Sequence, residues 1–375
     1  MSLAGRSAAS IVCSAIACAG CTPAPSPTAI ADRPPSTMAQ PMAASAPSAA
    51  ALPAAPTVTA EPWKWESGGV STPGETLITA HYRVNVTLRE GSLKRMFPIF
   101  AEAALEHYTT ALGRLPDPPH ALETMLFGSR TQWEDFTKER LGDDAGTYLA
   151  LGRGGYTIDA LSVLYDLGRW DTLALAAHEG WHQYTQATFK HSLPVWLEEG
   201  LATYMEGHRW GRNEDRPTFA PWRNFERFGE LREAARADEL IPLDELIEGA
   251  PQRFLRRDGR SKLLTYYAQV WALTHFIAEG EGGRYRAALE TLLQDAAAGR
   301  LAGKVATSPH LPPGRPRSMA SRLGKAVVLA YLNPDFAEFK QNYDRFVAAL
   351  VDRGMGDYIG RGESPVKAMN LDAPR

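Results

Sequence analysis

The spacing of two histidines places the strongest local constraint on this chain. His178 and His182 stand one helical turn apart, with Glu179 between them, in a segment whose apolar residues recur at helical spacing. Residues four apart lie on one face of an α-helix, so the two imidazoles can share a metal ion. Zinc accepts imidazole nitrogens at about 2.0–2.1 Å and favours tetrahedral geometry. Glu179 lies beside this face, where it can act as a general base without being a ligand. The H-E-x-x-H pattern therefore predicts a catalytic metal centre that hydrolyses a polar bond, most often a peptide bond.

The sequence around the motif supports a helix over residues 173–189. Its apolar stripe consists of Leu173, Ala174, Ala177 and Trp181. Gly180 is a weak helix former, but one interior glycine costs only about 1 kcal/mol. A small residue at this position could let another part of the backbone approach the metal.

A third ligand is expected in a second helix that begins near Pro194. Glu198 and Glu199 both lie in this segment, and adjacent helical side chains point about 100° apart, so only one of them can face the metal. Two histidines and one carboxylate would leave a fourth zinc position open, as catalytic rather than structural sites do.

At this point the chain resembles a known family. H-E-x-x-H at residues 178–182 followed by W-L-x-E-G-x-A at residues 196–202 is similar to the gluzincin metallopeptidases, the group of thermolysin and aminopeptidase N. Residues 177–184 and 267–276 resemble a bacterial branch called peptidase MA-like. The resemblance covers roughly residues 75–290.

The resemblance implies the roles of four residues. His178, His182 and Glu199 would bind one Zn²⁺ ion, with Glu199 preferred to Glu198 by the W-L-x-E-G register, and Glu179 would be the general base. Aminopeptidases of this group also carry an upstream G-x-M-E-N segment that binds the substrate's amine. The sequence lacks this segment, which weakens an aminopeptidase reading and leaves an endopeptidase or another hydrolase open.

Two further parts of the site follow from the resemblance. In gluzincins an edge strand ahead of the metal helix pairs with the substrate backbone, which would make Gly154, Gly155 and Tyr156 substrate-binding residues. The alternative is a plain core hairpin. A downstream Tyr or His often stabilises the oxyanion.

Tyr267 is the first choice for that oxyanion role, and Tyr266 and His275 are alternatives. An aromatic stripe on a helix is more often part of the core, so a purely structural role for these residues is also open.

The N-terminus predicts export. Residues 1–20 read as a signal peptide, and Ala19-Gly20-Cys21 resembles a lipobox, in which cleavage precedes a Cys that becomes lipidated. Cys18 departs from the Leu usual in that motif, so an ordinary cleaved signal is the alternative. Residues 21–60 are rich in Ala, Pro, Ser and Thr and predict an extended linker. We therefore expect a bacterial cell-envelope protein anchored to the membrane through lipid at Cys21.

Residues 61–375 predict one α+β domain of the gluzincin, thermolysin-like kind. A small N-terminal mixed sheet with an edge strand would precede the metal helices, and the C-terminal part would be mostly helical. Expected helices cover residues 93–112, 131–140, 240–247, 263–279, 284–298 and 336–350. Residues 299–324 predict a surface loop, and the charged stretch 209–236 predicts exposed helix and loop.

The function expected from these features is zinc-dependent hydrolysis of a peptide or protein substrate. The net charge of −3 gives no reason to expect nucleic acid as a partner. Two alternatives share the metal residues: a zinc hydrolase acting on a non-peptide envelope component, and a non-catalytic binding lipoprotein that retains the metal.

Overall fold

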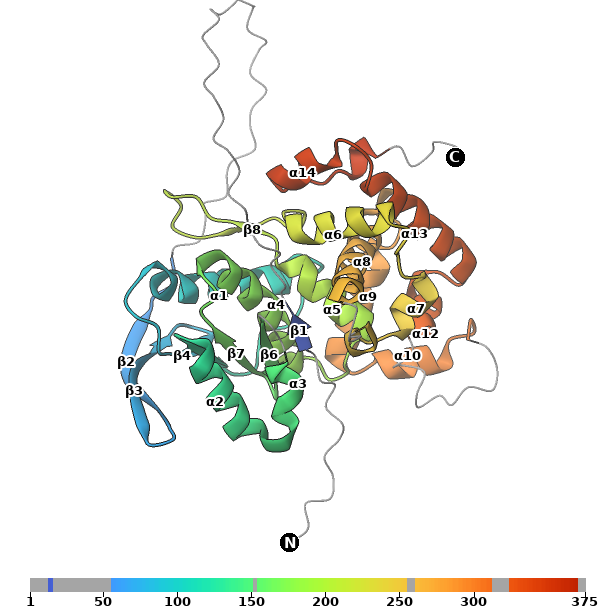
Figure 1. Cartoon of the computed structure of the whole chain (residues 1–375). Helices are drawn as coiled ribbons and strands as arrows, with labels where there is room; N and C mark the ends of the chain where they lie inside the picture. Colours follow the sequence, from blue (N-terminus) through green and yellow to red (C-terminus); the bar gives the residue numbers. More distant parts are fainter. Residues whose placement is uncertain (1–12, 16–54, 151–153, 255–259, 312–323, 370–375) are drawn as a thin grey trace, which may run out of the picture.

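The N-terminal half forms a mixed β-sheet and the C-terminal half is mostly helical (Figure 1). The computed structural model describes residues 13–15, 55–150, 154–254, 260–311 and 324–369. The predicted α+β class is confirmed. Cys21 and most of the predicted linker lie outside the described residues. Within the described ranges, we find no helix with the length and hydropathy of a membrane span.

Six strands make up the body of the sheet in the order β6-β7-β5-β4-β3-β2. Their bounds are β2 Thr59–Ser67, β3 Val70–Ile78, β4 Tyr82–Val86, β5 Leu122–Phe127, β6 Gly154–Ile158 and β7 Leu161–Tyr165. The β4–β5 and β5–β7 pairs are parallel, and the other neighbours are antiparallel. Outside β6, the short strand β1, Cys13–Ala15, adds a further antiparallel pair.

Helices cover both faces of the sheet, because successive strand residues point to opposite sides. Helices α1, Ser92–Thr110, and α4, Arg169–Thr188, share one core cluster with sheet residues such as Leu126 and Leu164. On the other face, α2, Arg130–Leu141, and α3, Ala145–Leu149, pack on a separate aromatic cluster. Figure 1 shows α4 on the same side as α1, alongside β6 and β7.

Two glycines allow close packing against the helices that carry the expected metal ligands. A Cβ at Gly180 in α4 would lie 2.6 Å from the hydroxyl of Tyr108, which donates to the carbonyl of Ala177 at 2.7 Å. This glycine therefore admits a tyrosine side chain from α1, rather than another backbone segment near the metal as the sequence suggested. In α5, Val195–Met205, a Cβ at Gly200 would lie 2.8 Å from the carbonyl oxygen of Val270 in α8.

Helix α8, Arg260–Glu279, is the centre of the helical half. Residues 266–277 are at most 2% exposed, so the helix is buried on all sides. Around it and beyond it lie α6 Phe225–Arg236, α7 Leu243–Glu248, α9 Arg286–Ala298, α10 Leu301–Thr307, α12 Gly324–Val327, α13 Phe336–Leu350 and α14 Met355–Arg361. A small ribbon, β8 His208–Arg209 with β9 Thr218–Phe219, lies between α5 and α6.

Two sequence predictions differ from this arrangement. Residues 299–324 are not only a surface loop, because α10 occupies 301–307 with Leu301 and Val305 buried in the core. Strand β2 begins at Thr59, slightly before the expected end of the linker at residue 60. The other predicted helices lie within four residues of the observed bounds.

Candidate metal centre

Helices α4 and α5 bring His178, His182 and Glu199 together in the interior. All three side chains are fully buried, and one ligand atom of each lies within 4.8 Å of the others. Oε2 of Glu199 lies 3.5 Å from Nε2 of His178 and 3.8 Å from Nε2 of His182. Ligand atoms about 2.0–2.1 Å from a tetrahedral zinc lie roughly 3.3–3.4 Å apart, so the observed spacing is close to that of a bound ion. This group of three could hold a metal ion.

The polar atoms of the group have unmet bonding capacity. Nε2 of His182 and both carboxylate oxygens of Glu199 are buried without a hydrogen-bond partner among the described residues. A buried polar atom left without a partner costs roughly 1–3 kcal/mol, and more when it is charged. A cation at this position would satisfy these atoms together, so the residues present fit a metal ion.

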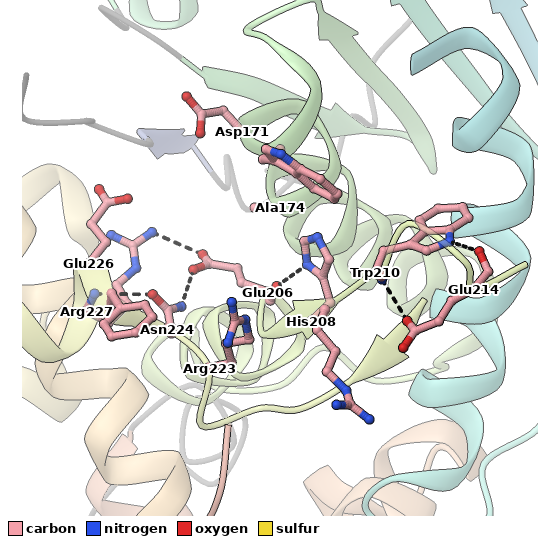
Figure 2. Close-up of a pocket in the computed structure, with 14 residues that line it drawn as sticks. Asp171, Ala174, Glu206, His208, Trp210, Glu214, Arg223, Asn224, Glu226 and Arg227 are labelled. Carbon is pink, nitrogen blue, oxygen red and sulfur yellow. Dashed lines mark hydrogen bonds and ion pairs between the residues drawn. The ribbon is translucent and has the colours of Figure 1, made fainter. Parts of the chain in front are cut away.

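His178 is oriented by a buried ion-pair network that contains Glu206 and Arg227. Its Nδ1 lies 2.8 Å from Oε1 of Glu206, just past the end of α5. A carboxylate only accepts, so Nδ1 carries a hydrogen and donates to Glu206, and Nε2 is the nitrogen that lies toward Glu199. Arg227 donates to Glu206 at 3.0 Å and Asn224 donates to it at 2.6 Å, both from the start of α6. Figure 2 shows Arg227 and Asn224 converging on the Glu206 carboxylate.

His182 has a carboxylate partner of its own. Its Nδ1 lies 3.0 Å from Oε1 of Glu198, which also accepts from the hydroxyl of Thr185 at 2.7 Å. Glu198 and Glu199 therefore both serve the centre in different ways. Glu199 is the potential ligand, whereas Glu198 holds the ring of a ligand in place. The sequence alone predicts the two carboxylates as alternatives for one ligand position, so their separate roles are a correction to that prediction.

The electrostatics of the group favour positive charge. Burial by itself lowers the pKa of His178, but the neighbouring carboxylates of Glu199 and Glu206 outweigh it and raise this pKa to about 9. Burial raises the pKa of Glu206, yet the charge of Arg227 and the contact with His178 hold it at about 2. With Glu179 and Glu199 also buried, carboxylates outnumber the one guanidinium, and a divalent cation would offset this excess.

Glu179 lies beside the group and is held from the sheet. Its Oε2 lies 2.9 Å from the hydroxyl of Thr157 in β6, which is also 3.0 Å from the backbone oxygen of Glu179. The other oxygen, Oε1, is buried without a partner among the described residues. Burial raises the pKa of Glu179, against the opposite effect of His182 and His178. A carboxylate with raised proton affinity and one free oxygen suits a general base.

The aromatic candidates on α8 occupy different surroundings. The hydroxyl of Tyr266 is buried without a partner among the described residues, and burial together with the charge of Glu199 raises its pKa well above the usual value. The ring of Tyr267 instead packs edge-on to His178 at 6.2 Å and lies under Arg227 at 5.2 Å. His275 stacks on Trp222 at 3.6 Å, within the core.

The predicted substrate strand forms β6, but the side chain of Tyr156 lies on the sheet face opposite α4. Tyr156 packs into the aromatic cluster on the opposite face, where its ring lies 5.8 Å from that of Trp133. A Cβ at Gly155 would lie 2.6 Å from Leu164 and 3.3 Å from Leu175, so α4 packs closely on this glycine. Only the backbone is available to a ligand at Gly154, Gly155 and Tyr156. Strand β1 pairs with this backbone in antiparallel register.

Three residues that support the metal group are not predicted from the sequence. Glu206 is seven residues from Glu199, two turns along the same helical face, and this spacing could have indicated it. Arg227 lies in the stretch expected to be exposed, yet it is 1% exposed and pairs with Glu206. Thr157 belongs to the strand that was expected to bind substrate, and nothing in the sequence points to its contact with Glu179.

The comparisons with known proteins cover the metal helices. A family described as "Protein of unknown function (DUF1570)" matches residues 172–297. The matched stretch, about a third of the chain, begins in α4 and ends in α9, so it includes the three potential ligands, Glu179 and the Glu206–Arg227 pair. No curated protein and no solved structure matches the chain.

Proposed function

We propose that this protein is a zinc-dependent hydrolase of peptide bonds. The observation that carries the proposal is the buried set of His178, His182 and Glu199, with the partnerless Oε1 of Glu179 beside it. Two imidazoles and one carboxylate, each ring oriented through Nδ1 by a further carboxylate, form a donor set that suits zinc.

Glu179, Thr157 and Tyr266 have separate roles in the proposed hydrolysis. Zinc, when bound, supplies Lewis-acid chemistry: it polarises a carbonyl and lowers the pKa of water. Glu179 accepts a proton from the attacking water and passes it to the leaving amine, as the water oxygen bonds to the carbonyl carbon and the C–N bond breaks. Thr157 fixes one oxygen of Glu179 and leaves the other free for this transfer. The Tyr266 hydroxyl is the donor that we assign to the oxyanion, in place of the sequence's first choice, Tyr267.

The full burial of the centre would also suit a structural metal. Structural zinc sites, however, have four protein ligands, and the group found among the described residues has three. A structural role also gives no reason for a buried carboxylate, Glu179, with an oxygen that nothing satisfies. These two observations favour catalysis over a non-catalytic binding protein.

A peptidase assay tests the proposal. Purified protein should hydrolyse internally quenched peptides, lose activity with a chelator and regain it with Zn²⁺. A protein that retains zinc but cleaves no peptide, while releasing product from a non-peptide envelope component, would contradict the peptide substrate and leave the metal chemistry in place.

We further propose that the protein is held in the cell envelope by lipid at Cys21. The support is the lipobox-like Ala19-Gly20-Cys21 at the end of a signal-like segment. Metabolic labelling with a radioactive fatty acid should label the wild-type chain and not Cys21→Ser. Equal labelling of both would rule out this anchor.

A further inference from the structure

A pocket of about 640 Å³ lies beside Glu206, and its size suits a small organic ligand (Figure 2). We call it the Glu206 pocket. Its wall comes from the start of α4, the segment after α5 that contains β8, and the first turn of α6. Within the described part of the chain, none of the three potential metal ligands lines it. A ligand in this pocket would therefore not contact the metal group directly.

Exposed aromatic side chains gather at the Glu206 pocket. Trp170 is 48% exposed and Phe225 is 55% exposed, and both line the pocket. The other large hydrophobic side chains exposed among the described residues are Val58 and Val70, and neither lines it. Trp210 adds a further ring to the wall. Aromatic surface that remains in water around one pocket indicates a ligand with an apolar body.

Arg227 brings unused hydrogen-bond donors to the same pocket. Its side chain is only 2% exposed, and Nη2 donates to Glu206 at 3.0 Å. Nε and Nη1 are buried without a partner among the described residues. A buried donor without a partner costs roughly 1–3 kcal/mol, and more when the group is charged. A carboxylate would satisfy such a donor through a charge-assisted hydrogen bond.

Further positive groups surround this guanidinium. The first turn of α6 lines the pocket, and the amino end of a helix carries a partial positive charge. Arg223 lines the pocket as well and donates through Nη1 to the carbonyl of Gly360 at 2.6 Å. Arg209, an exposed residue of β8, is a third arginine of the wall. These groups favour an anion over a cation.

Four carboxylates also line the pocket, but their charges are largely offset. Both oxygens of Glu206 already accept from side chains. Glu214 accepts from the backbone N–H of Gly211 at 2.8 Å, and Asp171 lies in the first turn of α4, where the helix dipole stabilises it. Burial raises the pKa of Glu226, which favours its neutral form. A neutral Glu226 can donate a hydrogen bond, and its Oε1 has no partner among the described residues.

We propose that the Glu206 pocket binds a small organic carboxylate with a flat apolar body, such as an aromatic acid. The carboxylate pairs with Arg227, and the apolar body packs against Trp170 and Phe225 at the pocket wall. This site is separate from the metal group, so the inference does not depend on the proposed hydrolysis.

Three probes of nearly equal shape test the charge of the ligand. Indole-3-acetate carries a carboxylate, indole-3-acetamide is neutral, and tryptamine carries an ammonium group. Isothermal titration calorimetry of the purified protein should show indole-3-acetate binding about 10-fold to 100-fold more tightly than the other two, because only the acid forms a charge-assisted hydrogen bond. Equal binding of the acid and the amide, tighter binding of tryptamine, or no saturable binding of any probe would overturn the inference.

Substitutions of the exposed rings test the position of the site. Trp170→Ala and Phe225→Ala should each weaken binding of indole-3-acetate about 3-fold to 10-fold, through the loss of an aromatic contact. Val70→Ala, which changes an exposed side chain away from the pocket, is the matched control and should bind as wild type does. Wild-type affinity in both ring variants would place the acid elsewhere and overturn the inference.

Arg227→Lys tests the guanidinium itself. Lysine keeps a positive charge near Glu206 but lacks the planar set of donors, so the preference for the acid over the amide should fall about 10-fold. Thermal unfolding identifies whether this variant is folded, and the two ring variants decide the question if it is not. A full preference in folded Arg227→Lys would overturn the inference. Peptide hydrolysis is tested separately by the chelator assay, so the two proposals can fail independently.

Discussion

Oε1 of Glu206 lies 2.8 Å from Nδ1 of His178, and this contact orients a potential ligand from outside the metal group. Partners of this kind typically contribute 10-fold to 100-fold to metal affinity. We expect Glu206→Gln to bind Zn²⁺ about 10–100 times more weakly in competition with a chromogenic chelator. Glu214→Gln, which changes an exposed carboxylate that lines one pocket together with Glu206, should bind as wild type does. Because Arg227 loses its buried partner in Glu206→Gln, thermal unfolding of the zinc-loaded proteins is the folding control. Equal affinities in both variants would contradict the role of Glu206.

Substitution of Glu199 should weaken zinc binding more than substitution of its neighbour Glu198. Glu199→Gln removes a ligand and should abolish stoichiometric zinc binding. Glu198→Gln removes only the partner of His182 and should lower affinity about 10–100-fold, with zinc still bound at saturation. Zinc content after gel filtration, measured by atomic absorption, distinguishes the two variants. The opposite order would make Glu198 the ligand.

The adjacent tyrosines of α8 form a natural pair of variants. Tyr266→Phe removes the partnerless hydroxyl and should reduce kcat about 100-fold to 1,000-fold, the usual loss of an oxyanion donor, with little change in KM. Tyr267→Phe keeps the ring against His178 and should retain most of kcat. Steady-state kinetics on one peptide substrate decide between them. A large kcat loss only in Tyr267→Phe would restore the assignment made from sequence.

Protonation of His107 should lower the free energy of unfolding in mild acid. Burial lowers its pKa to about 4 in the folded protein, whereas an unfolded histidine titrates near 6.5. The unfolded state therefore binds more protons than the folded state between pH 6.5 and pH 4. The free energy of unfolding consequently decreases as the pH falls through this window. The loss attributable to His107 between pH 7 and pH 5 should be about 1–2 kcal/mol.

His107→Phe keeps a ring against Phe219, which stacks on His107 at 4.8 Å, and removes the titration. Urea unfolding at pH 7 and pH 5 should show a smaller acid-induced loss in this variant than in wild type or in the exposed-site control His310→Asn. The same pH dependence in all three proteins would show that His107 does not titrate as described.

The sequence predicts most of the candidate metal centre because helical periodicity acts over short distances. One turn joins His178 to His182, and both predicted metal helices form where their apolar spacing indicates. Contacts between distant segments are not encoded in this way. Arg227 lies in a stretch with a surface-like composition, and only the packing of α6 against the end of α5 brings it to Glu206. Thr157 reaches Glu179 because β6 lies alongside α4.

The resemblance to a known family leads to the edge strand, but the structure changes what that strand offers. Tyr156 packs on the far face of the sheet, so the expected substrate contact is reduced to backbone. A cavity of about 480 Å³ beside Glu198 is lined by side chains from several elements, including β6, α4 and the segment before α5. No local sequence pattern indicates such a cavity.

The most direct test of the account compares zinc content and peptide hydrolysis in wild-type protein and Glu179→Gln. Glu179 is not a potential ligand, so the variant should bind one zinc ion per chain, as wild type should. Its kcat should fall about 100-fold to 10,000-fold, because the buried base is replaced by an amide that cannot accept the proton. Zinc bound one to one with hydrolysis lost is the predicted result. An unchanged rate of hydrolysis in Glu179→Gln would contradict the account.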